Sequence, residues 1–178
     1  MKQTLTLLLV TIFCFLTLSC TPDTSPHHNG QDFNTYEHDG LNLQHPKYWV
    51  LAYDESPALF ADRGVSFNTS EFSGASVLVY KDATMNIDKL ADYYERSLKL
   101  TSLEHIEEYQ RRPIALDGLK GIKLSWKNTL FETNIVEVNI FSVRATSEPA
   151  FVVFHLLDED IAKEAVNFLP FINSISLK

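Results

Sequence analysis

The sequence has few basic residues and few cysteines for its length. Its 178 residues include 15 Lys and Arg against 23 Asp and Glu, which gives a formal net charge of -8. Nucleic-acid binding needs clustered Lys and Arg to neutralise phosphates, and no such cluster exists beyond Arg111-Arg112. We therefore expect no nucleic-acid partner, and an acidic surface that serves solubility.

The short motifs of several enzyme classes are also missing. There is no Gly-x-Ser-x-Gly of serine hydrolases and no Gly-x-x-x-x-Gly-Lys phosphate loop, and the 6 glycines are scattered. His105-Ile106-Glu107-Glu108 does not complete the His-Glu-x-x-His motif of zinc proteases. No repeat of about 20–50 residues is present, which excludes a solenoid. We expect no catalytic residues, no metal site and no cofactor.

An apolar run near the N-terminus decides the expected compartment. It extends over residues 5–18, follows the positive Lys2, and is shorter than the roughly 20 residues that a membrane-spanning helix needs. These are features of a signal peptide, assigned here to residues 1–19. Cys14 lies inside the segment to be removed, so Cys20 has no disulfide partner in the mature chain.

The sequence Leu16-Thr17-Leu18-Ser19-Cys20 resembles a bacterial lipobox, in which the cysteine becomes the first residue and its thiolate takes a diacylglyceryl group. The resemblance implies lipidation of Cys20 and a membrane anchor. Thr21, in place of Asp, implies sorting to the outer membrane, with the domain facing the periplasm. The alternative is a soluble secreted protein in which Cys20 is incidental.

A polar segment follows the cysteine. Residues 20–34 are rich in Pro, Ser, Thr and Asn without apolar periodicity, which predicts a flexible tether ahead of one domain at residues 35–178. His27-His28 could be a metal pair, but a defined site needs further ligands.

The domain is expected to begin with a hairpin that the rest of the chain covers. Leu41 and Leu43 alternate with polar residues, which predicts a strand that Pro46 ends. Residues 48–53 predict the second strand, with Trp49, Leu51 and Tyr53 on one face.

The next segment mixes polar and aromatic residues. Residues 58–61 predict a short strand, and residues 62–74 predict a long loop. Phe67 and Phe72 lie in that loop, where they either hold it to its own domain or form a binding edge. Residues 75–80 are apolar on both faces and predict an interior strand.

Two helices are predicted. Asn86 is a good N-cap, and apolar residues follow it at spacings of three and four: Ile87, Leu90, Ala91, Tyr94 and Leu98. Asp158-Glu159-Asp160 opens a second helix through Leu169, because acids in a first turn favour the positive end of the helix dipole, and Pro170 ends or kinks it. A calcium loop is the alternative for this triplet, but it lacks the spacing and the turn glycine of an EF-hand.

Strands account for most of the remainder. The charged residues 103–116 predict an edge strand that contains Pro113, and Asp117-Gly118 predicts a tight hairpin into a strand with Ile122, Leu124 and Trp126 on one face. Residues 135–144, 150–157 and 174–177 predict three more strands. This order predicts an α+β fold with a mostly antiparallel sheet flanked by helices.

These features resemble the PsbP-like fold: Gly40 before an alternating strand, Pro46, Trp49, the Asp117-Gly118 hairpin and a terminal helix running into Ser174-Ile175. That fold is shared by an extrinsic subunit of photosystem II, a nuclear-transport factor that binds the GTPase Ran, and many small bacterial lipoproteins. The resemblance implies an α/β/α sandwich over about residues 34–178. It brings no catalytic residues.

Histidines supply the remaining candidate site residues. His155, on the same strand face as Val153, is expected in the core, with a catalytic role as the alternative. His38 and His45, with Glu37 and Asp39, could form a weak cation site if they approach each other.

Three functions stay open. The leading hypothesis is a membrane-tethered, non-enzymatic module that binds an envelope protein through its sheet edge and loops. The alternatives are a small-ligand or metal site between sheet and helix, and an enzyme of unrecognised type.

Overall fold

The computed structural model describes residues 32–58, 60–101, 105–129, 134–144 and 146–178. Its helices and strands are, in chain order, β1 (Phe33–His38), β2 (Leu41–Pro46), β3 (Val50–Glu55), β4 (Arg63–Asn68), β5 (Gly74–Val79), α2 (Ile87–Thr101), β6 (Ile106–Leu116), β7 (Leu119–Asn128), β8 (Asn134–Ser142), β9 (Ala150–Leu157), α3 (Glu159–Ser174) and β10 (Ser176–Leu177).

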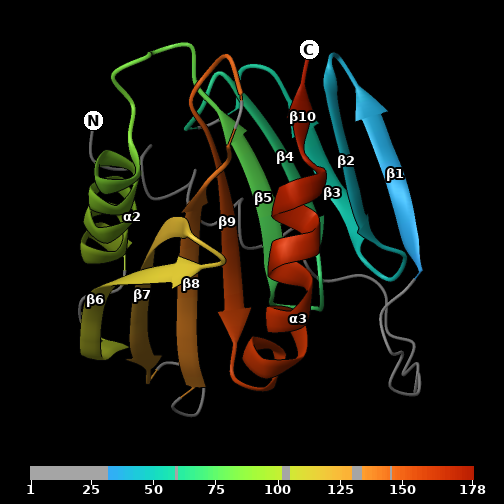
Figure 1. Cartoon of the computed structure of the whole chain (residues 1–178). Coiled ribbons are helices and arrows are strands. Elements are labelled where there is room, and N and C mark those ends of the chain that lie inside the picture. Colours follow the sequence, from blue (N-terminus) through green and yellow to red (C-terminus); the bar gives the residue numbers. More distant parts are fainter. Residues whose placement is uncertain (1–31, 59, 102–104, 130–133, 145) are drawn as a thin grey trace, which may run out of the picture.

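The strands form two antiparallel sheets. The larger has the order β3-β4-β5-β9-β8-β7-β6 and the smaller β1-β2-β10. Helix α3 lies in front of the large sheet beside the small one, and α2 lies at the opposite side of the molecule, over β7 and β8 (Figure 1). The predicted α+β fold, a mostly antiparallel sheet with helices on both faces, is confirmed.

Each face of the large sheet has its own apolar core. On one face Phe154 stacks on Phe168 of α3 with ring centroids 3.9 Å apart, and Trp49 and Phe171 join them. On the other face Leu90 of α2 packs with residues such as Leu124. Strand β9 supplies side chains to both cores, so its predicted central position is confirmed.

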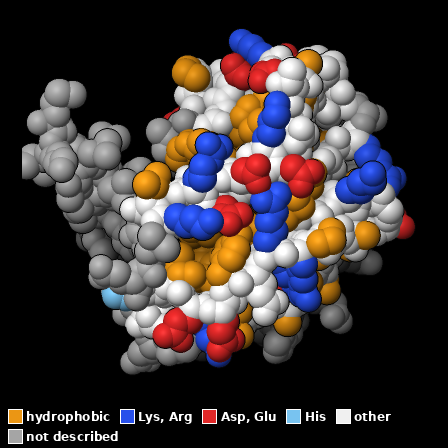
Figure 2. Space-filling view, turned by 90° about the vertical axis from the view of Figure 1, so that its left-hand side faces the viewer, with side chains coloured by type: hydrophobic (Ala, Val, Ile, Leu, Met, Phe, Trp, Pro, Cys, Tyr) orange, Lys and Arg blue, Asp and Glu red, His pale blue; other side chains and the backbone are white. Residues whose placement is uncertain are grey.

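Helix α2 begins as its residues predict, but its ion pairs with β6 were not predicted. The Asn86 Oδ1 accepts the N–H of Lys89 at 3.0 Å, which caps the first turn. Arg111 of β6 lies near Asp88, Asp92 and Glu95, at 3.2, 2.5 and 3.5 Å. Figure 2 shows the acidic and basic side chains interspersed on this side of the molecule.

The predicted hairpin at residues 117–118 is confirmed. Asp117 and Gly118 have φ angles of 48° and 73°, which a two-residue turn of matching twist requires. A side chain at Gly118 would also come within 3.0 Å of the Arg144 guanidinium. The preceding strand β6 is the sheet edge that was expected from its charges.

The prediction of a first hairpin at residues 41–53 was wrong. β2 pairs with β1 and β10, while β3 pairs with β4 in the other sheet and with no further strand of the described ranges. The sequence of β1 is polar, and its residues Tyr36 and Phe33 are only partly buried, so its pattern gave no strong strand signal.

Residues 62–74 are not one long loop. β4 occupies Arg63–Asn68, and Phe67 is 0% exposed in the core. Val65 and Phe67 alternate with Gly64 and Ser66, which is the period-two pattern of a strand. The pattern is short and has polar residues on both sides, so it is hard to recognise in the sequence. Residues 58–61 form no strand among those the structure describes.

Helix α3 does not end near Pro170 but continues to Ser174. A proline inside a helix costs about 3 kcal/mol or more. Phe171 and Ile172, at 0% and 2% exposure, each contribute about 1.5–3 kcal/mol when buried. Their burial offsets the proline.

Candidate functional site

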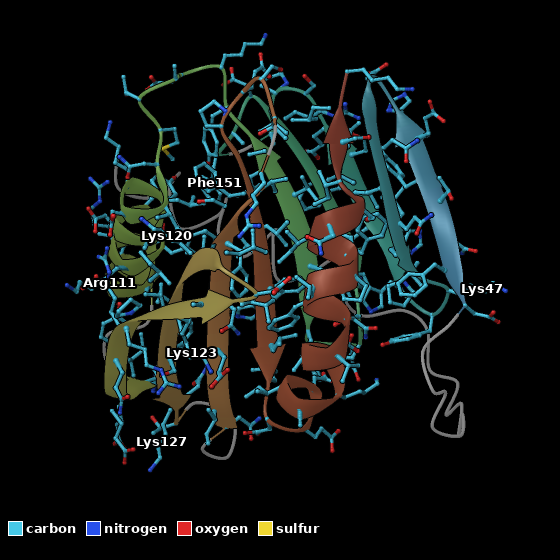
Figure 3. The ribbon with its side chains drawn as sticks, viewed as in Figure 1. Lys47, Arg111, Lys120, Lys123, Lys127 and Phe151 are labelled. Carbon is cyan, nitrogen blue, oxygen red and sulfur yellow. The ribbon has the colours of Figure 1, made fainter. Side chains whose placement is uncertain are left out.

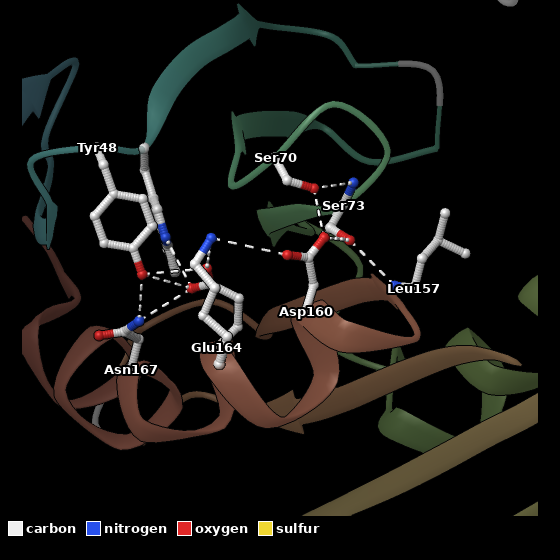
Figure 4. A network of polar contacts seen from close by, with 9 residues as sticks. Tyr48, Ser70, Ser73, Leu157, Asp160, Glu164 and Asn167 are labelled. Carbon is white, nitrogen blue, oxygen red and sulfur yellow. Dashed lines mark hydrogen bonds and ion pairs between the residues drawn. The ribbon is translucent and has the colours of Figure 1, made fainter. Parts of the chain in front are cut away.

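One side of α3 carries a row of polar residues that faces two loops. Asp160, Lys163, Glu164 and Asn167 follow one another at helical spacing and lie next to the β4–β5 turn and the residues before β3 (Figure 4).

Glu164 is the centre of this row and is 0% exposed. Its Oε2 accepts hydrogen bonds from Trp49 Nε1, the Tyr48 hydroxyl and Asn167 Nδ2, each at 3.0 Å. Burial raises the pKa of this carboxyl, and the three donors and nearby Lys163 oppose that rise. Burial and the Glu164 charge also raise the pKa of Tyr48 to about 12.

Asp160 binds the β4–β5 turn. Its Oδ2 accepts the hydroxyls of Ser70 at 2.5 Å and Ser73 at 2.7 Å, and the Ser73 Oγ accepts the N–H of Leu157 at 3.1 Å. The carboxylates in this row are thus used to join α3 to the loops, and we interpret the row as a structural joint.

The acidic triplet at the start of α3 does not form a calcium loop. Asp158 Oδ1 accepts the N–H of Ile135 at 2.7 Å, Asp160 binds the serines, and Glu159 is exposed. The described residues contain no cluster of metal-ligating side chains. Glu159 and Asp160 do lie in the first helical turn, as predicted.

A second polar cluster joins the small sheet to β3. Asp54 accepts a hydrogen bond from the Tyr36 hydroxyl, lies 2.5 Å from His38 Nδ1 and is 3.6 Å from Arg63. Burial alone would raise the pKa of Asp54, but the hydrogen bonds from Tyr36 and His38 and the charge of Arg63 hold it below its usual value. Arg63 also donates to the carbonyl oxygens of His38 and Asp39, at 2.7 and 2.6 Å.

The hypothesis of a cation site at His38 and His45 was wrong. In the β1–β2 register His38 pairs with Leu41 and His45 with Asn34, so the two lie at opposite ends of the hairpin. His45 is buried with its ring 4.5 Å from Phe67, and burial lowers its pKa.

His155 is not the core residue that was predicted. Its neighbours Phe154 and Leu156 are buried on the α3 face, but His155 itself is exposed. His155 lies on the same face of β9 as Val153, which is buried in the core on the α2 side. His155 is two residues closer than Val153 to the C-terminal end of the strand.

The strand β3 has a surface that the sequence did not predict. Trp49 is buried as expected, but Val50, Leu51 and Tyr53 are 64%, 47% and 39% exposed. The β3–β4 register shifts between Leu51 and Tyr53, so Ala52 has no partner on β4. A bulge of this kind leaves no mark in hydrophobic periodicity.

Cys20 and the pair His27-His28 lie outside the described residues. Lipidation at Cys20 therefore stays a prediction, as do the signal peptide and the tether. No helix in the described ranges combines the length and apolar character needed to cross a membrane.

No protein-family model matches the sequence, and no curated protein matches it significantly. Among solved structures, the chain is similar to cyanobacterial PsbP (CyanoP) from Synechocystis sp. PCC 6803. The two are 14% identical with a TM-score of 0.49, over 89% of this chain and 100% of that chain. It is also similar to the Ran-binding protein Mog1p of Saccharomyces cerevisiae, with 11% identity, a TM-score of 0.42 and coverage of 82% and 96%. The PsbP-like resemblance found in the sequence includes both of these groups of proteins. The structural similarity to them is a similarity of fold.

Proposed function

We propose that this chain is a lipid-anchored, non-enzymatic accessory module that binds another protein of the cell envelope. The observation that carries the proposal is the exposed apolar surface of residues 48–53. Four of the nine large apolar side chains exposed in the described part of the chain lie there, namely Tyr48, Val50, Leu51 and Tyr53. Exposed apolar side chains that are concentrated in one segment at a sheet edge are typical of interaction sites.

The position of this surface is consistent with a tethered module. The chain reaches the described domain at Asp32, whose carboxylate pairs with Lys47 Nζ at 3.1 Å and whose carbonyl accepts the Lys47 N–H at 3.0 Å. Lys47 lies beside the small sheet, on the side of the molecule opposite Arg111 and Lys127 (Figure 3). The chain from the predicted anchor would thus enter the domain beside Lys47, which lies three residues before the start of β3.

The interior supports this proposal over a ligand pocket between sheet and α3. Aromatic rings occupy that space, with Trp49 and Phe171 centroids 5.0 Å apart and Phe154 stacked on Phe168. The polar groups nearest to it, around Glu164, bind one another. We therefore favour a function of the surface.

The test is chemical crosslinking in intact cells, followed by purification of the full chain. We expect one specific envelope protein with the wild type and its loss with Leu51→Lys. Val166→Lys is the matched control, because Val166 is a 72% exposed apolar residue on α3, away from β3. Recovery of only abundant lipoproteins, or of the same proteins with all three forms, would contradict the proposal.

A further inference from the structure

Strand β3 is a sheet edge with backbone groups available for pairing. It is the outermost strand of the seven-stranded sheet and, among the described residues, it pairs with β4 alone. The backbone N–H and C=O groups on the outer side of such a strand can bind the backbone of another extended chain.

The other edge of this sheet is protected by charges and a proline that the first four residues of β3 lack, while both edge strands contain one register irregularity. β6 carries charges at Glu107, Glu108, Arg111 and Arg112, contains Pro113, and has an irregular register between Glu107 and Gln110. All of these features discourage pairing with another strand. The first four residues of β3, Val50 to Tyr53, have neither charge nor proline, and the bulge at Ala52 is the one irregularity there.

Charge lies at one end of β3 only. Asp54 is compensated by Arg63 and His38, but Glu55 is exposed, and no described residue forms an ion pair with it. An added strand would therefore meet apolar side chains along most of its length and an uncompensated carboxylate at the C-terminal end of β3.

We propose that β3 accepts an extended segment of the envelope partner as an added antiparallel strand. In the β3–β4 register Val50, Tyr53 and Glu55 share one face of the sheet, and Leu51 lies on the other. The segment presents apolar side chains to Val50 and Tyr53 on the first face and to Leu51 on the second, and a Lys or Arg to Glu55. Because the added strand runs antiparallel, that basic residue lies at its N-terminal end. This inference rests on the proposed function and adds the mode of binding to it.

A second copy of the chain fits this edge less well. Antiparallel pairing of two β3 strands about their midpoint would place Glu55 opposite Val50, which offers no cation. Each chain also carries a formal net charge of -8, so the two copies would repel.

Two labelled peptides of equal composition test the proposal on the full chain in detergent micelles. They are Lys-Thr-Val-Val-Val-Thr, whose three valines would face Tyr53, Leu51 and Val50 when its Lys faces Glu55, and the reverse sequence, Thr-Val-Val-Val-Thr-Lys. We expect the first to bind about three- to fivefold tighter, the range of an exposed ion pair, and amide hydrogen exchange in Val50–Glu55 to slow by about tenfold or more on binding. Glu55→Lys should abolish the preference, Leu51→Lys should abolish binding, and Val166→Lys should change neither.

Equal binding of the two peptides, preference for the reverse peptide, or unchanged exchange in β3 would overturn the inference. A dimer in sedimentation that Leu51→Lys dissociates would also overturn it, because the occupant would then be a second copy. If crosslinking still recovers an envelope partner that Leu51→Lys loses, the proposed function stands and only strand addition fails. Circular dichroism of each variant confirms that it is folded.

Discussion

Glu164 shows what one buried charge does in this domain. Its carboxylate is removed from water by α3 and by Tyr48 and Trp49, and three donors compensate it. Burial raises the pKa of Glu164 in the folded state above its value in the unfolded state. At pH values between these two pKa values, the folded chain therefore binds more protons than the unfolded chain. The contribution of Glu164 to stability is therefore greatest at low pH and decreases as the pH rises through the raised pKa.

Replacing Glu164 by Gln should remove this dependence. We expect the free energy of unfolding of the wild type, relative to Glu164→Gln, to fall as the pH rises above 4.5, the ordinary pKa of a glutamate, and through the raised pKa of Glu164. The fall should be about 1.4 kcal/mol for each unit by which the pKa is raised. Urea unfolding at several pH values measures it. A constant difference between the two proteins across this range would contradict the assignment.

The donors of Glu164 can be tested separately. Tyr48→Phe leaves the buried carboxylate short of one donor, which should cost about 1–3 kcal/mol of stability at neutral pH. Tyr53→Phe is the matched control, since Tyr53 is exposed on the neighbouring strand and should change stability by less than about 0.5 kcal/mol. Equal effects of the two changes would show that the Tyr48 hydroxyl bond is unimportant.

At the scale of elements, the sequence predicts those whose pattern is local. α2 follows from Asn86 and its apolar stripe, the β6–β7 hairpin from Asp117-Gly118, and β9 from an apolar run. β4 was missed because it is held by long-range contacts, such as Phe67 with Phe171 at 6.1 Å between ring centroids. The extension of α3 past Pro170 depends on the same core. β1 was missed although its turn into β2 is local: Asp39 and Gly40, with φ angles of 42° and 77°, form the same kind of two-residue turn as Asp117-Gly118, but the polar sequence of β1 hides the strand.

The candidate surface could be predicted only in part. The aromatic and apolar residues of 48–53 are visible in the sequence, but which of them face water depends on the bulge at Ala52 and on the separation of β2 and β3 into two sheets. Neither feature leaves a local signal. The Glu164 joint was missed for a similar reason, because its partners Tyr48 and Trp49 are distant in sequence.

The two phenylalanines of residues 62–74 test the position of β4 directly. Phe67→Ala should lower the free energy of unfolding by about 3–5 kcal/mol, because a fully buried ring leaves a cavity. Phe72→Ala should change it by less than about 0.5 kcal/mol, since Phe72 is 60% exposed. Thermal unfolding of the two variants measures the difference, and a reversed order would place Phe72 in the core.

At the scale of the whole molecule, the proposed function joins the described domain to a predicted lipid anchor at Cys20. The polar clusters around Asp160 and Asp54 each join one element to another, and four of the nine exposed large apolar residues of the described chain lie at residues 48–53. We propose that this arrangement holds a partner near a membrane.

The anchor itself has a simple test. Cys20→Ser should leave an unprocessed or released protein without acyl mass, while Cys14→Ser should be processed and membrane-bound like the wild type. Fractionation of the cell envelope with intact-mass measurement distinguishes them. The contrary result is a Cys20→Ser protein that stays in the membrane and differs in mass from the wild type only by the replacement of one sulfur by one oxygen. That result would show that no lipid is attached to Cys20.

The most direct measurement of the central claim is site-specific photo-crosslinking in intact cells, with the photoreactive residue at Val50 in one form and at Val166 in the other. The account predicts one discrete adduct with an envelope protein from position 50 and none from position 166. An adduct from position 166 but not from position 50 would contradict it.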